Sequence, residues 1–449
     1  MKKQWTIQNW RNFKILQQPK WNNKNILNQV IKNLSNNPPL VFVDEIKTLK
    51  KKLADASIGK RFLLQGGDCA ETFSNFSAND IKDKLKILLQ MSVVLTYGAN
   101  CNVIRLGRIA GQFAKPRSLD IEKNNGISLP SYRGDAINDL EFSKKKRTPN
   151  PKRMLKAYYQ SAATLNLLRA FTNGGFANIN KIQHWNHEFI KNSPQGKKYK
   201  NLTIKIDNTL EFMAATGIKR KSLTNDNFSA FFTSHEALLL DYESSLSRQD
   251  SITKKWYGCS AHFLWVGDRT RQLNSAHVEF LSGLDNPIGI KAGPSIKPDE
   301  LVTLCKKLNP SNELGKLTII TRMGADLINT KLPPLIKIIK KNDLNVLWVC
   351  DPMHANTYKS KSGYKTRHFD TILQELQRFF ELLYKNDSIP GGLHFEFTGE
   401  NVTECLGGAQ AISDIDLKSK YETACDPRLN NEQSLEMAFL MADLIRKKL

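Results

Sequence analysis

The feature of this sequence that most constrains its fold is a series of eight short apolar runs that end in polar or glycine residues. The runs lie at 62–64, 103–106, 230–232, 263–266, 287–291, 317–321, 346–349 and 393–397. Continuous apolar runs of this length are typical of parallel strands that are buried on both faces. Eight of them, alternating with helical stretches, predict a (β/α)8 barrel. A doubly wound open sheet also alternates strands with helices, but the count of eight and the polar cluster after nearly every run favour the barrel.

The spacing of these runs predicts where the barrel is extended or interrupted. The gap between the second and third runs, about 119–228, is long enough to hold an insertion, and a helix is expected within it over about 152–170. Residues 1–58 precede the first run and are predicted to form an N-terminal extension of helices and loops. The catalytic barrel domain is then 59–449, and 432–448 should form an amphipathic helix at its end.

Composition narrows the class of protein. No apolar run approaches the roughly 20 residues that cross a bilayer, so no membrane partner is expected. The first ten residues lack the apolar segment of a signal peptide, which favours a cytoplasmic location. Seven scattered cysteines without a CxxC pair argue against a disulfide framework and against a zinc ribbon. The net charge of +23 is spread along the chain without a nucleic-acid-binding motif, so no nucleic-acid partner is expected.

Four cationic residues lie at the end of an apolar run or within three residues after it: Arg108, Arg269, Lys291 and Arg322. In a (β/α)8 barrel the carboxyl ends of the strands converge on one mouth, so these side chains should meet there. Each one alone is more often a surface ion pair. Four cations at one mouth would repel one another unless an anion neutralised them, and arginine matches carboxylate and phosphate groups. The pattern therefore predicts a site for a multiply anionic substrate.

A possible metal-binding set also lies near these ends: Cys69, His354, Glu396 and Asp426. A thiolate, an imidazole and two carboxylates suit manganese, cobalt, iron or zinc better than magnesium or calcium. Their spacing has no local signature, and a lone cysteine or histidine is more often a core residue. His394 shares a strand face with Glu396, so it is either a partner of a metal ligand or a filler of the barrel interior.

Nine motifs occur in order over nearly the whole chain. They cover 64–73 (LQGGDCAETF), 108–118 (RIAGQFAKPRS), 129–135 (LPSYRGD), 161–169 (SAATLNLLR), 234–243 (SHEALLLDYE), 269–272 (RTRQ), 350–354 (CDPMH), 397–408 (FTGENVTECLGG) and 421–430 (YETACDPRLN). In these stretches the sequence closely resembles the class II 3-deoxy-D-arabino-heptulosonate 7-phosphate (DAHP) synthases of plants and many bacteria. The resemblance implies a (β/α)8 barrel with an N-terminal extension and inserted helices.

The resemblance also implies an activity. Such an enzyme is a transferase that condenses phosphoenolpyruvate, erythrose 4-phosphate and water to DAHP and phosphate, the first step of the shikimate pathway of aromatic amino acid biosynthesis. It implies a divalent metal, manganese above cobalt, iron or zinc, on the GGDCAE cysteine, the DPMH histidine, the glutamate before TGEN and the ACDPR aspartate. These positions are Cys69, His354, Glu396 and Asp426.

The substrate contacts and the assembly follow from the same resemblance. Phosphoenolpyruvate is expected on Arg108, Lys291 and Arg322, with Arg269 beside them, and the aldose phosphate on Lys115, Arg117 and Ser118. A homodimer or homotetramer is expected. The sequence departs from the family pattern at Asp268, where a longer glutamate is expected, and either this residue or a metal-bound water would handle protons. A catalytically degenerate barrel that binds a phosphorylated ligand and regulates a partner is the alternative.

Overall fold

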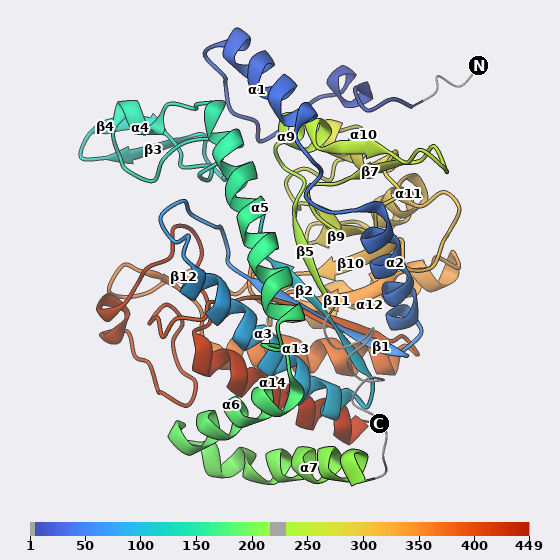
Figure 1. The fold of residues 1–449 in the computed structure, drawn as a ribbon, viewed down its shortest axis with the longest axis vertical. Helices are drawn as coiled ribbons and strands as arrows, with labels where there is room; N and C mark the ends of the chain where they lie inside the picture. Colours follow the sequence, from blue (N-terminus) through green and yellow to red (C-terminus); the bar gives the residue numbers. More distant parts are fainter. Residues whose placement is uncertain (1–4, 216–229, 449) are drawn as a thin grey trace.

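Eight parallel strands close into a barrel in the computed structural model, which describes residues 5–215 and 230–448 (Figure 1). Around the barrel the strands follow the order β1-β14-β11-β10-β9-β8-β5-β2. Their bounds are Arg61–Gly67 (β1), Asn102–Arg108 (β2), Phe231–Glu236 (β5), Phe263–Val266 (β8), Ile288–Ala292 (β9), Leu317–Thr321 (β10), Leu347–Cys350 (β11) and Pro390–Glu396 (β14). Each of the eight predicted runs overlaps one of these strands, which confirms the (β/α)8 barrel.

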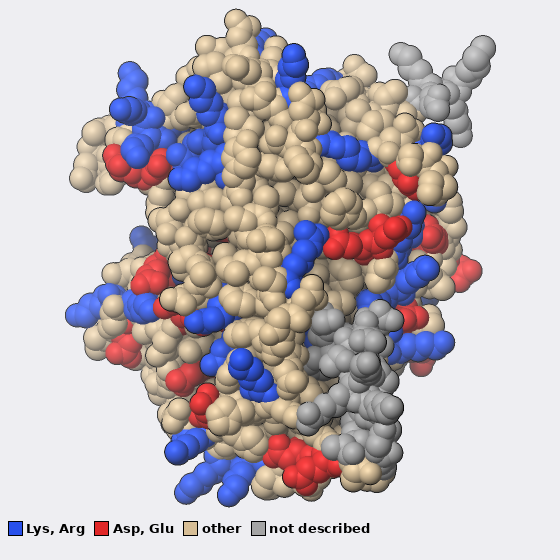
Figure 2. Space-filling model, viewed as in Figure 1, with Lys and Arg blue, Asp and Glu red and all other residues tan. Residues whose placement is uncertain are grey.

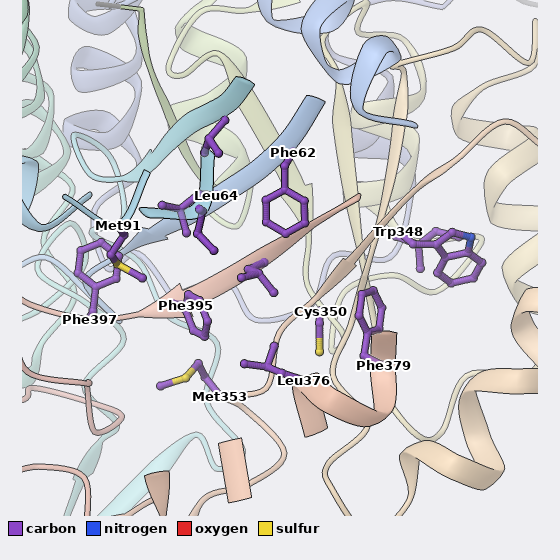
Figure 3. Packing of buried hydrophobic residues seen from close by; sticks show 14 of the residues in the cluster. Phe62, Leu64, Met91, Trp348, Cys350, Met353, Leu376, Phe379, Phe395 and Phe397 are labelled. Atoms are coloured by element: carbon purple, nitrogen blue, oxygen red, sulfur yellow. The ribbon is translucent and has the colours of Figure 1, made fainter. Parts of the chain in front are cut away.

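Helices surround the barrel and bury the outward faces of its strands. They are α3 (Ala78–Ala99), α10 (Ala276–Ser282), α11 (Pro298–Leu308), α12 (Ile328–Lys341), α13 (Phe369–Lys385) and α14 (Asn431–Lys448), and α14 confirms the predicted C-terminal helix. Helix α3 begins where the Ser77 side chain accepts a hydrogen bond from the Asp80 amide, and it ends at Asn100 in a left-handed conformation. Figure 3 shows outward residues of β1 and β14, including Leu64 and Phe395, packed in this core. Burial of each such side chain stabilises the fold by about 1.5–3 kcal/mol.

A helix from the N-terminal region fills the end of the barrel where the strands begin. Helix α2 (Val43–Ser57) directs Leu49, Leu53 and Ala56 into one cluster with inward-facing strand residues. Those strand residues are Leu63, Ile104, Leu106, Phe232, Phe263, Trp265, Ile320, Leu347 and Val349. Leu49, Leu53 and Ala56 are fully buried, so this end of the barrel is closed by apolar packing.

The remaining elements lie before the barrel, in the insertion or in loops. They are η1 (Asn9–Asn12), α1 (Lys24–Asn36), β3 (Ile121–Asn124), β4 (Ile127–Pro130), α4 (Lys144–Arg147), α5 (Lys152–Asn173), α6 (Ile179–Asn192), α7 (Gly196–Ala215), α9 (Leu240–Ser245), β6 (Ser247–Gln249), β7 (Trp256–Gly258), β12 (Tyr358–Lys359), β13 (Lys365–Thr366) and η2 (Asp416–Ser419). Helix α5 confirms the helix predicted over 152–170, and β3 to α7 confirm the insertion after the second strand. The end of the predicted insertion, 216–228, lies outside the described residues, as do 1–4 and 449.

Figure 2 shows lysine and arginine side chains spread over one face of the molecule, with acidic side chains among them, and no single basic stripe. All seven cysteines are free thiols, as expected for a chain without a disulfide framework. Within 5–215 and 230–448, no helix combines the length and the apolar character of a membrane span.

Candidate active site

The carboxyl ends of the barrel strands surround a cavity of about 440 Å³. Ten of the twelve predicted site residues line it: Arg108, Lys115, Arg117, Ser118, Asp268, Arg269, Lys291, Arg322, His354 and Asp426. The other two, Cys69 and Glu396, are buried and contact cavity-lining residues. Strand geometry explains the convergence, because alternate residues of each strand point inward and the last inward position faces the mouth.

Three of the four predicted metal ligands lie together. Ligand atoms of Cys69, Glu396 and Asp426 are all within 4.8 Å of one another. The Cys69 Sγ lies 3.5 Å from Asp426 Oδ2 and accepts a hydrogen bond of 3.3 Å from the Asp426 amide. The fourth predicted ligand, His354, is adjacent but not part of this group of three. Its Nε2 lies 2.8 Å from Glu396 Oε1, and its Nδ1 lies 2.7 Å from Asp351 Oδ2.

Cations hold the two carboxylates of this cluster in their ionised form. Lys115 Nζ lies 3.5 Å from Glu396 Oε1 and 3.3 Å from Asp426 Oδ2. Arg367 donates to Glu396 Oε2 at 2.7 Å, and Lys365 pairs with Asp426. Burial alone would raise the pKa of Glu396, but His354, Lys115 and Arg367 together bring it well below its usual range. Lys115 and Arg367 likewise lower the pKa of Asp426 against the effect of burial.

This cluster fits a divalent transition metal. Its carboxylates attract positive charge so strongly that the Lys115 ammonium lies between them, where a metal cation would neutralise the same two groups. A buried sulfur beside two carboxylates favours a transition metal over magnesium or calcium. Burial, together with the Cys425 thiol and the Glu396 charge, raises the pKa of the Cys69 thiol. A bound metal cation would reverse that shift, because coordination favours the thiolate.

A second group of charged side chains lies next to the metal-ligand cluster. Arg108 donates from Nη2 to Glu396 Oε1 at 3.0 Å and to the Cys69 carbonyl at 3.2 Å. Lys291 pairs with the buried Asp351. Burial and the nearby Arg108 lower the pKa of Lys291 to about 8, although Asp351 opposes the shift.

Arg322 completes this group from β10. Its Nη1 donates to Asp268 Oδ2 at 3.0 Å, and its Nη2 donates to the His354 carbonyl at 3.1 Å. Asp268 also accepts from Arg271 at 3.0 Å. The shorter acid at position 268 is therefore held by two arginines and helps to aim one of them into the cavity.

The residues predicted for the aldose phosphate divide between two places. Ser118 lies at the rim, where its Oγ accepts a hydrogen bond of 2.9 Å from Nη2 of Arg269, the residue predicted beside the phosphoenolpyruvate cations. Arg117, also at the rim, pairs with Glu122 at 2.8 Å. Lys115 instead extends inward to Glu396 and Asp426, where it belongs to the metal-ligand cluster in this structure.

Two buried glutamates hold the loops that carry the cations. Glu71 accepts hydrogen bonds from the amides of Ala110, Gly111 and Gln112, which begin two residues after Arg108. Glu375 accepts from the amides of Met323 and Gly324, directly after Arg322, at 2.9 Å each. Buried backbone donors that are satisfied in this way fix a loop, so both arginines leave their strands in defined directions.

Sequence reasoning missed several residues of this site. Glu236 is the last residue of β5 and lines the cavity; its Oε1 has no hydrogen-bond partner among the described residues. Burial raises the pKa of Glu236 despite the nearby Lys115 and Lys291. The strand-end rule could have identified Glu236. Arg367 and Lys365 lie in the region between β11 and α13, where no strand pattern points to the mouth.

Comparisons with known proteins show which family the chain belongs to. The model of the class-II DAHP synthetase family matches residues 5–442. The phospho-2-dehydro-3-deoxyheptonate aldolase of Streptomyces coelicolor is 49% identical over 437 residues, which cover 97% of this chain and 96% of the relative. The phospho-2-dehydro-3-deoxyheptonate aldolase AroG of Mycolicibacterium smegmatis is 48% identical over 436 residues, which cover 96% of this chain and 92% of the relative.

A solved structure with that aldolase name, from Francisella tularensis SCHU S4, aligns over 94% of this chain and 97% of its own, with a TM-score of 0.48 and 17% sequence identity. The assignment does not depend on it, because the family model and two relatives near 50% identity each span almost the whole chain. The chain belongs to the class-II DAHP synthetase family.

Proposed function

We propose that this chain is a DAHP synthase that joins phosphoenolpyruvate to erythrose 4-phosphate at the cavity formed by the barrel mouth. One observation carries the proposal: the cavity gathers cations from several strand ends next to a buried thiol and carboxylate cluster, in a chain whose relatives are phospho-2-dehydro-3-deoxyheptonate aldolases. Cations suit two phosphorylated substrates, and the cluster suits a metal. The overall reaction consumes one water and releases inorganic phosphate.

The cations at the strand ends would bind phosphoenolpyruvate. Arg108, Lys291 and Arg322 all line the cavity, and each already contacts a carboxylate in the structure. Their positions are therefore set before substrate arrives, which reduces the reorganisation needed at the transition state. Arg269 and Ser118, with Arg117 beside them, would bind the phosphate of the aldose at the rim.

The metal would be held by Cys69, His354, Glu396 and Asp426, and manganese is the metal that we propose first. When bound, such an ion supplies Lewis acidity to a carbonyl oxygen. His354 has the arrangement of a metal ligand, since its Nδ1 lies 2.7 Å from Asp351 Oδ2 and its Nε2 faces the cluster. The same carboxylate contacts Lys291, so Asp351 connects the metal ligands with the phosphoenolpyruvate cations.

Proton handling fits Glu236 better than Asp268. Asp268 is committed to Arg271 and Arg322, both at 3.0 Å, and serves to orient Arg322. Glu236 instead presents a buried oxygen without a partner among the described residues, and its pKa is raised by burial. A carboxyl group whose pKa is raised can hold a water molecule by a hydrogen bond and exchange a proton with it. The water that adds to the enol carbon would be placed there.

The proposal is tested by release of inorganic phosphate from purified protein. Release that requires both phosphoenolpyruvate and erythrose 4-phosphate, with DAHP formed in equal amount, is the expected result. Release from phosphoenolpyruvate alone would indicate a phosphatase. No release with any of manganese, cobalt, iron or zinc would favour the alternative, a degenerate barrel that binds a phosphorylated ligand and regulates a partner. A homodimer or homotetramer and a cytoplasmic location stay predictions, of which light scattering checks the first.

A further inference from the structure

The imidazole of His394 lies beneath the cavity and contacts two of the substrate cations. His394 is on β14 and is fully buried. Its Nε2 lies 2.6 Å from Arg108 Nη1 and 2.9 Å from Lys291 Nζ. Arginine and protonated lysine have donors but no acceptor, so Nε2 must be the acceptor in both contacts. The ring is therefore unprotonated at Nε2.

The other nitrogen of the ring is fixed by a side chain of the neighbouring strand β1. His394 Nδ1 lies 2.7 Å from Gln65 Oε1, and Gln65 Nε2 lies 3.0 Å from Ser234 Oγ. Ser234 Oγ in turn lies 3.0 Å from the Gly107 carbonyl. A carbonyl only accepts, so Ser234 donates to Gly107 and accepts from the Gln65 amide. The Gln65 oxygen is then free to accept a hydrogen bond from the Nδ1–H group of His394.

The two ends of this chain of hydrogen bonds require the same tautomer independently. The cations require a lone pair on Nε2, and the Gly107 carbonyl, through Ser234 and Gln65, requires a proton on Nδ1. Strand register brings the inner pair together, because Gln65 is the direct partner of His394 in the β1–β14 pairing. Trp265 packs edge-on against the imidazole, with ring centroids 5.6 Å apart, and limits its rotation.

We propose that His394, held as the neutral Nδ1–H tautomer by Gln65, is a positioning residue that orients Arg108 and Lys291 for the phosphoenolpyruvate anion. The inference rests on the proposed function, because it takes those two cations as substrate contacts. Glu396 pairs with Arg108, and Asp351 pairs with Lys291. The His394 side chain, in contrast, forms hydrogen bonds with both of these cations.

A neutral acceptor suits this position better than an acid or a charged histidine. A third carboxylate would cancel the positive charge that attracts the substrate, and an imidazolium would repel both cations. The neutral ring aligns the two cations and leaves their charge available. In this proposal His394 acts on the two substrate cations, rather than as a partner of a metal ligand or as a filler of the barrel interior.

The test compares two replacements of His394. In His394→Gln the side-chain oxygen can reach the place of Nε2 and accept from the cations, whereas His394→Leu keeps a similar volume without an acceptor. We expect the KM for phosphoenolpyruvate to rise about tenfold or more in His394→Leu, as for loss of a hydrogen bond to a charged group. We expect His394→Gln to recover most of this loss. In both, the KM for the aldose and the manganese content should stay within about twofold of the wild type.

Two further variants provide a second test and a control. Gln65→Met removes the acceptor for Nδ1–H without touching the cations, and should raise the same KM by a smaller factor. Gln65→Met also tests the proposal if His394→Leu does not fold. His277→Leu is the matched control, because His277 is a buried histidine outside the site whose Nε2 lies 3.0 Å from the Leu238 carbonyl. It should leave the KM for phosphoenolpyruvate unchanged.

The outcomes separate the two proposals. If the wild-type protein converts its substrates, and neither Arg108→Ala nor Lys291→Met weakens the binding of phosphoenolpyruvate, the proposed binding residues are wrong. If those two variants weaken the binding of phosphoenolpyruvate but His394→Leu and Gln65→Met do not, the positioning role of His394 is overturned. Equal losses in His394→Leu and His394→Gln, or a loss that follows manganese content, would also overturn that role. Absence of turnover in the wild type would refute the proposed function itself.

Discussion

The two ends of the barrel are built from the same strands but have opposite chemistry. Along β2 the inward residues are Ile104, Leu106 and then Arg108. Along β11 they are Leu347 and Val349, and Asp351, directly after this strand, contacts Lys291 and His354. Two residues of a strand span roughly 6.5 Å, so the interior changes from apolar packing to charge within a few layers. The end that α2 fills is packed with apolar side chains, and the mouth is polar and charged.

This contrast indicates a division of tasks. Apolar side chains at the start of the strands contribute burial without directional demands. Charged side chains at the ends of the strands are costly to bury, and each is tied to partners that set its direction. Substitutions at the α2 end should therefore change stability with little effect on turnover, and substitutions at the mouth should do the reverse.

The largest effect is expected for Glu396→Gln at the mouth. This change removes a charge that Arg108, Lys115 and Arg367 share and takes an anionic ligand from the metal cluster. Loss of a metal that stabilises the transition state by several kcal/mol should lower kcat about a thousandfold or more. Phosphate release and bound manganese, measured on the same sample, check this. A variant that retains both would show that Glu396 is not a ligand.

At the opposite end, Leu53→Ala should act on stability alone. Leu53 is fully buried in the cluster that fills the start of the barrel. The cavity left behind should lower the free energy of unfolding by about 2–5 kcal/mol, while Leu53→Met, which conserves volume, should cost less than about 1.5 kcal/mol. Urea unfolding, with kcat and KM measured below the transition, separates the two quantities. A tenfold fall in kcat of the folded variant would break the proposed division.

An intermediate effect is expected for Asp268→Asn. The change weakens the hydrogen bonds that Arg271 and Arg322 make to this carboxylate, and Arg322 is then less firmly directed into the cavity. We expect kcat/KM for phosphoenolpyruvate to fall about tenfold, as for loss of a charge-assisted contact. Asp268→Glu keeps the charge and should lose much less. If Asp268 were the proton-handling residue, Asp268→Asn would instead reduce kcat with KM unchanged.

The smallest effect is a pH dependence. The pKa of Lys291 is lowered to about 8 by burial and by Arg108. Protonated lysine binds the substrate anion, so binding is complete below that pKa and is lost as the pH rises through it. The value of kcat/KM for phosphoenolpyruvate should be about twofold below its plateau near pH 8 and fall further above it. Lys291→Arg should remove this alkaline limb. An unchanged limb in that variant would assign the titration to another group.

The two regions also differ in how far the sequence predicted them. Strands such as β10 were predictable because a run buried on both faces is continuously apolar, and Arg322 because it directly follows that run. Glu236 follows the same rule but was missed. Arg367 and Lys365 could not be predicted, because long-range packing, which no local pattern records, places their region against Glu396 and Asp426.

Two of the predicted site residues make contacts that the sequence did not indicate. Lys115 is predicted at the aldose phosphate, and in this structure its ammonium lies 3.5 Å from Glu396 Oε1 and 3.3 Å from Asp426 Oδ2. His354 was expected as one of four ligands, and it contacts Glu396 without joining the group of three. The fold follows from local patterns, whereas these contacts depend on loops that meet only in the folded chain.

The central claim is that the charged mouth carries out metal-dependent condensation, and phosphate release during chelation and metal restoration tests it most directly. With both substrates present, release should stop when a chelator strips the protein and should return when manganese is added back, whereas Glu396→Gln should stay inactive throughout. Release that continues unchanged after complete metal removal would contradict the account.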